Sequence, residues 1–428
     1  MAQATTSPSS MRGAGRLSGR CRWAAHRTAW RSMTRVAALA LALLLGSLSA
    51  GAAERMVIGY VDLMNDARHE DRAGFGGIVF EQRGRPHDGA ALALEDLAMA
   101  AQAGGIEFEL VAIQAADPAG AVGAIETLRI ERGARFILID APAETVAAAA
   151  RAVRGDGRIL LFNVSAEADA LRGADCSTHV MHLIPSTAMR TDALMQLVVV
   201  RKWRDVLVLE GPDARDADLV RALERSAKRF GVRIAAKRPF VLGSDPRERD
   251  QNNLALLTSA ASYDVVFVAD DSREFSRFLP YQTMSPRPVI GAAGLTAEAW
   301  HWAWDRDGGT NVSRRFRRMA QRPMRGEDWA AWIGVKSIVE AALRARSTDF
   351  ATVAAYLKGN EFRMDGSKGQ ALSFRPWDNQ LRQPVQLATQ DAVITQAPFP
   401  QFLHQSENLD TLGADRPDSL CRFPSDSR

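Results

Sequence analysis

The chain has 428 residues, with 54 basic and 50 acidic side chains. This length exceeds what one ordinary hydrophobic core encloses, so we expect two lobes. Seven arginines lie within the first 53 residues, and the rest of the chain carries 47 basic against 50 acidic residues, which excludes the strongly basic surface of a nucleic-acid-binding protein.

The segment 1–53 has the pattern of a secretory signal peptide. An arginine-rich stretch without acidic residues precedes the apolar run 36–45, and small residues follow at 49–53. The apolar run is too short to remain as a membrane-spanning helix. We therefore predict cleavage near Ala53 and export to the periplasm. Met33 offers an alternative translation start that would give a leader of more usual length.

Strands and helices alternate through the first half of the exported chain. The predicted strands are 55–63, 107–113, 136–140 and 159–162. The predicted helices are 88–103, 118–132 and one that opens at Pro142, where a proline is tolerated. Regular alternation of this kind predicts a parallel sheet covered by helices on both faces.

The segment 178–213 reads as strand, helix and strand with short connections. Ser186 follows a proline and can cap the helix by accepting a hydrogen bond from a free backbone N–H. The continuous apolar run 206–209 is typical of a strand covered on both faces. We interpret this β–α–β unit as the place where the chain crosses from one α/β lobe to the other.

The same alternation then restarts. Predicted strands follow at 232–240, 264–269, 288–291, 370–374 and 384–388, and predicted helices at 214–230, 249–261, 327–344 and 350–357. The last two strands lie near a second and a third crossing. The resulting division places 54–182 with 293–370 in lobe 1 and 183–292 with 371–396 in lobe 2, and it leaves 397–428 as an irregular C-terminal tail.

Two cysteines remain after the leader, Cys176 and Cys421. An even pair in a chain bound for an oxidising compartment predicts a disulfide, which would hold the tail beside the first crossing. Two unpaired thiols are the alternative.

Known catalytic motifs are missing from the sequence. There is no G-x-S-x-G, no Walker A and no H-E-x-x-H, so we expect no catalytic residues. Trp300, Trp302 and Trp304 either pack between lobes or form an aromatic wall of a ligand cleft. The segment 305–311 has oxygen ligands in alternation but no glutamate at the twelfth position, so it predicts a surface turn and not a calcium loop.

Acidic residues follow four of the predicted strands: Asp62, Asp140, Glu210 and the pair Asp270–Asp271. Ligands of open α/β sheets bind outside the carboxyl ends of the strands. Each acid alone is more often a turn residue or a helix cap, but together they indicate a cationic ligand, either an amine or a hard metal ion. Ser186 and Trp300 complete this set of predicted ligand-binding residues, and no cofactor is expected.

The residues of five segments resemble one family. These segments are 184–197, 263–275, 286–300, 368–387 and 409–421. The chain resembles type I periplasmic substrate-binding proteins of ABC transporters, in the branch associated with pyrroloquinoline-quinone (PQQ)-dependent alcohol oxidation. The resemblance implies two parallel-sheet α/β lobes joined by three crossings, and a monomeric solute receptor that serves a membrane permease and its ATPase. The setting beside quinoprotein dehydrogenases makes a lanthanide or its chelate a candidate ligand.

Two other functions stay open at this stage. One is a periplasmic ligand sensor or metal carrier that partners a quinoprotein dehydrogenase without transport. The other is a secreted α/β hydrolase, which would need a nucleophile with a paired base that the sequence does not display.

Overall fold

The computed structural model describes residues 54–423 apart from 75, 243–246, 248–251 and 260–261. The predicted signal peptide, 1–53, lies outside the described residues. Within the described part of the chain, no helix has the length and apolarity needed to cross a bilayer.

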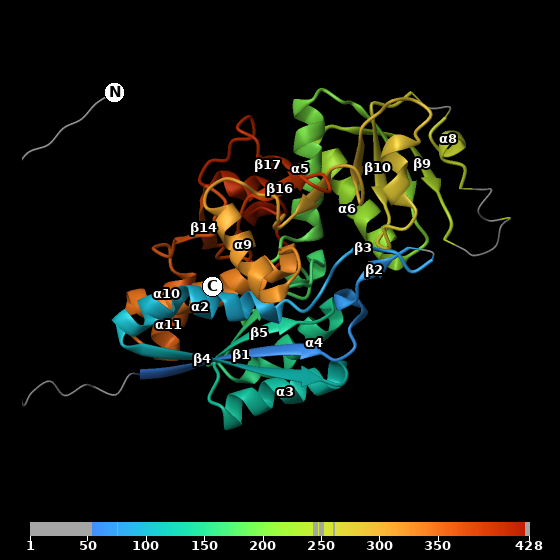
Figure 1. Cartoon of the computed structure of the whole chain (residues 1–428). Helices are drawn as coiled ribbons and strands as arrows, with labels where there is room; N and C mark the ends of the chain where they lie inside the picture. The colour runs from blue at the N-terminus through green and yellow to red at the C-terminus, as the bar shows by residue number, and fades with distance from the viewer. Residues whose placement is uncertain (1–53, 75, 243–246, 248–251, 260–261, 424–428) are drawn as a thin grey trace, which may run out of the picture. The chain divides into compact units, whose positions relative to one another are not determined.

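The first sheet has five parallel strands in the order β4-β1-β5-β6-β7 (Figure 1). Their bounds are β1 Glu54–Leu63, β4 Ile106–Ala115, β5 Phe136–Asp140, β6 Leu160–Asn163 and β7 Val180–His182. Helices α3 (Pro118–Glu131) and α4 (Ala143–Ala152) cover one face, where Leu128 packs near Ile139. Helices α2 (His87–Gly104) and α10 (Gly326–Ala345) cover the other, where Leu92 packs near Leu138. The predicted parallel sheet with two covered faces is confirmed.

The second sheet has four parallel strands in the order β11-β10-β8-β9. Their bounds are β8 Asp205–Glu210, β9 Arg233–Pro239, β10 Val265–Ala269 and β11 Val289–Gly291. Helix α6 spans Ala214–Phe230, as predicted, because Asp213 and Asp216 form a capping box at its start and Gly231 ends it with a φ of 69°. Of the predicted helix 249–261, the structure describes α8, Leu254–Leu257, while part of the range lies outside the described residues.

The first crossing leads from β7 into α5, Thr187–Val200. Ser186 is its N-cap, and the Ser186 hydroxyl accepts a hydrogen bond from the Met189 N–H at 3.3 Å. The buried residues of α5 belong to the core of the second sheet, whereas β7 belongs to that of the first. The chain therefore changes lobes at this unit, although the full lobe limits stay predictions.

Several short strands were not predicted, because two to five residues give too little periodicity. They are the hairpin β2 Arg72–Ala73 with β3 Val79–Glu81, then β12 Thr296–Glu298, β13 Met364–Asp365, β15 Leu381–Arg382 and β17 Val393–Ala397. The predicted strands β14 (Ala371–Phe374) and β16 (Val385–Ala388) pair antiparallel with these short neighbours. They form two three-stranded sheets, β13-β14-β15 and β12-β16-β17, while the hairpin β2–β3 stands as a separate sheet.

The segment after residue 304 corrects one expectation. The predicted surface turn is present at 305–308, which is exposed, but residues 309–311 already belong to helix α9, Gly309–Ala320, whose buried Val312 and Phe316 pack into the lobe 1 core. Gly308 makes the entry at a φ of 82°, which favours glycine. Helix α11 follows α10 at Phe350–Lys358, close to its predicted range.

Trp300 and Trp304 are buried, and Trp300 stacks on Trp329 with ring centroids 6.2 Å apart. The Trp300 indole N–H donates to the Ser313 hydroxyl at 3.3 Å. Both tryptophans belong to the lobe 1 core, so of the two interpretations the structure favours packing, although within one lobe rather than between lobes.

The C-terminal tail is tied to the rest of the chain. Cys421 forms a disulfide with Cys176, as predicted. In the 3-10 turn η5, Asn408–Thr411, the last three residues are buried, and Asp410 pairs with Arg375 at 2.8 Å and with Arg382 at 2.8 Å. The remaining 3-10 turns are η1 Ala67–His69, η2 Val153–Gly155, η3 Asp169–Arg172, η4 Ser276–Tyr281 and η6 Arg416–Asp418.

Candidate functional site

Two buried carboxylates lie side by side at the carboxyl edge of the first sheet. Asp62 on β1 and Asp140 on β5 are partners in the parallel register, and neither is exposed. The structure therefore brings together two of the acids that the sequence singled out.

Each of these carboxylates already has basic partners from the protein. Asp62 accepts two hydrogen bonds from Arg85, at 2.5 and 2.9 Å. Asp140 accepts a hydrogen bond from the Ser165 hydroxyl at 2.6 Å, and it lies 2.9 Å from His69 Nε2 and 3.4 Å from Arg68. The counter-charge that two adjacent carboxylates need is therefore supplied from within the chain.

The electrostatics of this pair follow from burial and from the basic neighbours. Burial alone would raise the pKa of Asp140, but the contact with His69 and the charge of Arg68 outweigh it and lower that pKa. Burial alone would likewise lower the pKa of His69, but the contact with Asp140 outweighs it and raises that pKa. Asp140 and His69 thus favour each other's charged forms.

Oxygen and nitrogen atoms suited to a metal ion converge here. One ligand atom each from Asp62, His69 and Asp140 lie within 4.8 Å of one another. A cation at this point would have to displace Arg85 from Asp62 and compete with Arg68 for Asp140. The ligand atoms for a metal ion are therefore present, but the negative charge of the two carboxylates is already neutralised by basic side chains of the protein.

We expect His69 to stabilise the protein more at low pH than at high pH. Because its folded pKa lies above the ordinary value, its stabilisation is fully present below the unfolded pKa of about 6.5 and is lost as pH rises through the folded pKa. The destabilisation caused by His69→Gln should therefore be larger at pH 5.5 than at pH 8.5. Urea unfolding of both proteins across this range measures it.

His87→Gln is the matched control. Burial and the nearby Arg85 lower the pKa of His87, so its contribution is present above the unfolded pKa and is lost as pH falls. The two variants should show opposite trends with pH. The same trend in both variants would contradict the assignment.

The acids on the second sheet are engaged locally. The Asp270 carboxylate accepts hydrogen bonds from the Ser272 hydroxyl and from the backbone N–H groups of Arg273 and Ser276, at 2.6 to 3.0 Å, so it caps its own loop. Asp271 pairs with Arg215 at 3.2 Å. Glu210 lies opposite Ala269 at the end of β8 and is half-buried. Their role toward a ligand stays a prediction, as does that of Ser186 and Trp300.

Sequence reasoning missed a larger group of alternating charges, which we call the charged cluster. It comprises five arginines and four glutamates: Arg72, Glu81, Arg83, Glu167, Arg190, Arg273, Glu298, Arg325 and Glu327. They come from the hairpin β2–β3, the loop after β6, helix α5, the loop after β10, strand β12 and the start of α10. Within the sequence, a hint is the pair of arginines just after Glu81, Arg83 and Arg85.

Ion pairs connect the charged cluster across elements of both sheets. Arg273 lies 3.5 Å from Glu81 and 3.4 Å from Glu298. Arg190 pairs with Glu167 and lies 4.0 Å from Glu298. Since Glu81 and Glu167 follow elements of the first sheet and Arg273 follows a strand of the second, the cluster joins the two lobes.

The side chains of the charged cluster are partly accessible to solvent. Its side chains keep between 9% and 31% of their area accessible. Burial is nevertheless the largest influence on every pKa shift within it, and the arginine charges hold the pKa of Glu327 at about 2 against that burial. Because these side chains are partly accessible and come from elements of both lobes, we take the charged cluster as the candidate site.

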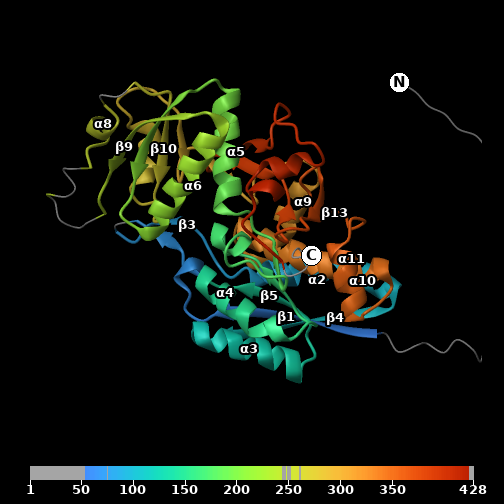
Figure 2. The same ribbon diagram turned by 180° about the vertical axis from the view of Figure 1, so that it is seen from behind.

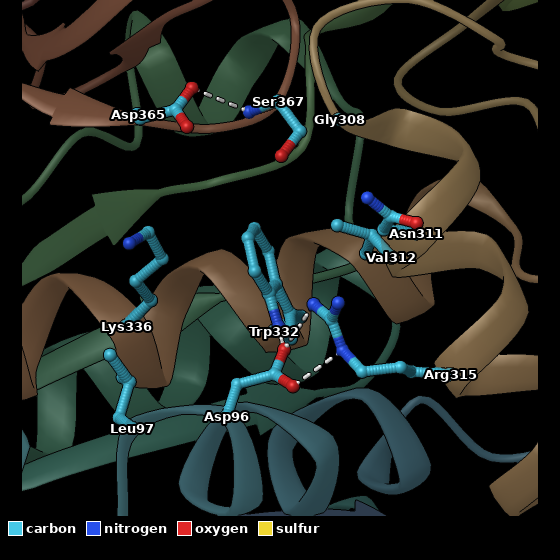
Figure 3. Close-up of a pocket in the computed structure, with 10 residues that line it drawn as sticks. All are labelled: Asp96, Leu97, Gly308, Asn311, Val312, Arg315, Trp332, Lys336, Asp365 and Ser367. Carbon is cyan, nitrogen blue, oxygen red and sulfur yellow. Dashed lines mark hydrogen bonds and ion pairs between the residues drawn. The ribbon is translucent and has the colours of Figure 1, made fainter. Parts of the chain in front are cut away.

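A separate pocket of about 310 Å³ lies in the helical layer of lobe 1. Figure 3 shows Asp96 from α2 between Arg315 from α9 and Trp332 from α10. Both partners donate to Asp96 at 2.9 Å, so its carboxylate is occupied. None of its lining residues belongs to the charged cluster or to the carboxyl edge of the sheet, and we assign it no role in the candidate site.

Comparisons with known proteins identify the fold. A family model described as periplasmic binding protein matches residues 81–280. No curated protein sequence matches the chain. The branched chain amino acid ABC transporter periplasmic ligand-binding protein of Burkholderia xenovorans is 15% identical, with a TM-score of 0.64 over 78% of this chain and 91% of that one.

Two further structures agree. The ABC transporter substrate-binding protein of Sphaerobacter thermophilus is 18% identical, with a TM-score of 0.64 over 84% of this chain and 100% of that one. The solute binding protein of an ABC transporter from Rhodopseudomonas palustris, in complex with 3,4-dihydroxy benzoic acid, is 14% identical, with a TM-score of 0.58 over 80% of this chain and 94% of that one. The architecture is that of type I periplasmic binding proteins, as the sequence resemblance implied.

Proposed function

We propose that this chain, with its type I periplasmic binding protein fold, is the periplasmic solute-binding component of an ABC transporter and catalyses no reaction. The observation that carries the proposal is the charged cluster, because side chains from both lobes meet in it. The matches to transporter substrate-binding proteins support the same assignment.

The mechanism is capture by lobe movement. A solute that pairs with charged groups of both lobes favours the arrangement in which the lobes are together, and the lobes move by hinging at the crossings. A membrane permease with its ATPase would recognise the solute-loaded form. We propose that the protein acts as a monomer in the periplasm after removal of the leader.

An amino acid is the leading solute class in this proposal. Its carboxylate and its ammonium group can both find partners in a cluster of five arginines and four glutamates. One similar structure is described as a branched chain amino acid transporter protein, and another holds an aromatic carboxylic acid. A carboxylate is common to both kinds of compound.

The cationic ligand and the link to PQQ-dependent alcohol oxidation remain narrower proposals. The link rests on the sequence resemblance, and the cation rests on the convergence of Asp62, His69 and Asp140. A calcium or lanthanide ion that binds there should be released by Asp62→Asn together with Asp140→Asn. A metal carrier or sensor that serves a quinoprotein dehydrogenase without transport would require such an ion.

A thermal-shift screen of the protein purified after export tests the proposed function. A compound that binds only the folded state raises the melting temperature, by an amount that grows with its concentration. We expect L-leucine or another amino acid, or 3,4-dihydroxybenzoate, to do so, and calorimetry then gives the affinity. A panel of amino acids, aromatic acids, amines, calcium and lanthanum salts in which nothing raises the melting temperature would refute the proposal.

A further inference from the structure

Glu81 is shared by four arginines. Its Oε1 lies 3.1 Å from Arg83 and 3.2 Å from Arg325, and its Oε2 lies 3.3 Å from Arg72 and 3.5 Å from Arg273. The four guanidinium groups come from the hairpin β2–β3 and its exit, the start of α10, and the loop after β10. One carboxylate therefore faces four positive charges.

These contacts are longer than a well-formed charged pair. A charge-assisted hydrogen bond between an arginine and a carboxylate usually measures about 2.7–2.9 Å. A carboxylate offers about four lone-pair sites, so Glu81 can face all four guanidinium groups, but at 3.1 to 3.5 Å each ion pair is weaker than a well-formed one. The arginines therefore remain under-neutralised: burial and the charges of Arg273 and Arg83 lower the pKa of Arg72 to about 10.

The neighbouring acids do not remove this excess. Glu327 lies 3.4 Å from Arg325, and Glu298 lies 3.4 Å from Arg273. Glu298 is also near Arg190, which pairs with Glu167. Within the charged cluster, five arginines face four glutamates, an excess of one positive charge that Asp271, outside the cluster, partly offsets at Arg72.

Glu81 reaches this position from a hairpin that spans the two lobes. The hairpin β2–β3 extends from the first sheet toward the second (Figures 1 and 2). Phe80 lies beneath the Arg277 guanidinium of η4, 4.9 Å from ring centroid to carbon, and Arg273 pairs with Glu81 itself. The carboxylate thus sits on a strand that contacts lobe 2 beside the arginines.

We infer that Arg72, Arg83, Arg273 and Arg325 form the subsite for the carboxylate of the solute, and that Glu81 is a resident counter-ion which weakens its binding. The inference rests on the proposed function and names the part of the site that takes the anionic group. A carboxylate solute would supply the missing negative charge, and Glu81 would compete with it for the same donors.

The inference predicts that two substitutions change the affinity for carboxylates in opposite directions. Glu81→Gln removes a negative charge while keeping the side-chain size, so carboxylates should bind about tenfold more tightly, as expected for one unit charge a few ångströms away in a partly solvated site. Arg273→Gln should weaken their binding by a similar factor. A cationic solute would show the reverse order.

The experiment measures Kd by calorimetry for the wild type and both variants. The probes are L-leucine, 3,4-dihydroxybenzoate and its cationic counterpart 3,4-dihydroxybenzylamine. Arg221→Gln is the control, since it removes one arginine charge from an exposed pair with Asp218, away from the charged cluster, and it should leave every Kd within about twofold. Melting temperatures of all variants show that each is folded.

The measured Kd values separate the inference from the proposed function. Tighter carboxylate binding by Glu81→Gln together with weaker binding by Arg273→Gln supports the inference. Weaker carboxylate binding by both variants, or no change in either, would overturn it while leaving the proposed function in place. Failure of every compound of the thermal-shift panel to bind the wild type would overturn the proposed function, and the inference with it.

Discussion

Replacing Asp410 with alanine is expected to destabilise the protein by about 3–5 kcal/mol, because it would leave a buried charge without its partner. Asp410 and Arg375 are each about 1% exposed at the side chain and pair at 2.8 Å, and Arg382 adds a second contact at 2.8 Å. The Arg375 guanidinium also donates to the carbonyls of Leu409 and Leu412. Without Asp410, this guanidinium would keep these two carbonyls and the more distant Asp378, at 3.8 Å, as partners.

Urea unfolding followed by tryptophan fluorescence measures this loss. Asp418→Ala is the matched control, because Asp418 is an exposed acid of the same tail and its removal should change the free energy of unfolding by less than about 0.5 kcal/mol. Asp410→Asn should fall between the two, since the amide oxygen can still accept one hydrogen bond. A loss below about 1 kcal/mol for Asp410→Ala would show that the tail does not contribute to the cooperative unit.

The second large effect concerns the disulfide. Cys176 and Cys421 are 245 residues apart, so the bond restricts the unfolded chain over most of the described length. Replacing both cysteines with serine should lower the free energy of unfolding by about 2–5 kcal/mol. The measurement compares urea unfolding of the double variant with the oxidised wild type.

Reductant supplies the control for this experiment. Dithiothreitol should shift the wild type toward the stability of the double variant and should leave the double variant unchanged. If, without dithiothreitol, the wild type and the double variant unfold at the same urea concentration, the disulfide either does not form in the exported protein or does not restrain its unfolded state.

The sheets could be predicted because their signals are local. The apolar run 206–209 and the exact limits of the 214–230 helix follow from a continuous buried strand, a capping box and a terminal glycine, all within short stretches of sequence. The carboxyl-edge rule likewise placed Asp62 beside Asp140. The short strands and helix α9 were not predicted, because their apolar periodicity is brief or lies among many polar residues.

The chemistry of the site could not be predicted in the same way. The sequence pattern indicated uncompensated negative charge at Asp62 and Asp140. Their basic partners Arg85, Arg68 and His69 reach them only through the tertiary structure, which the sequence pattern does not reveal. Asp270 looked like a ligand residue, yet its hydrogen bonds to its own loop are also what an acid after a strand commonly makes. The charged cluster draws on segments from residue 72 to residue 327, and no spacing in the sequence relates them.

The tail also sets a mechanical limit on the molecule. Gly413 is bonded on the lobe 2 side, through its N–H to Asp192 of α5 and through its carbonyl to Arg229 of α6. Eight residues later, Cys421 is covalently joined to Cys176, which lies between two strands of the first sheet. Eight residues reach at most about 28 Å when fully extended. The tail is therefore a tether of fixed reach, and the lobes cannot swing apart beyond its length unless the Gly413 contacts break first.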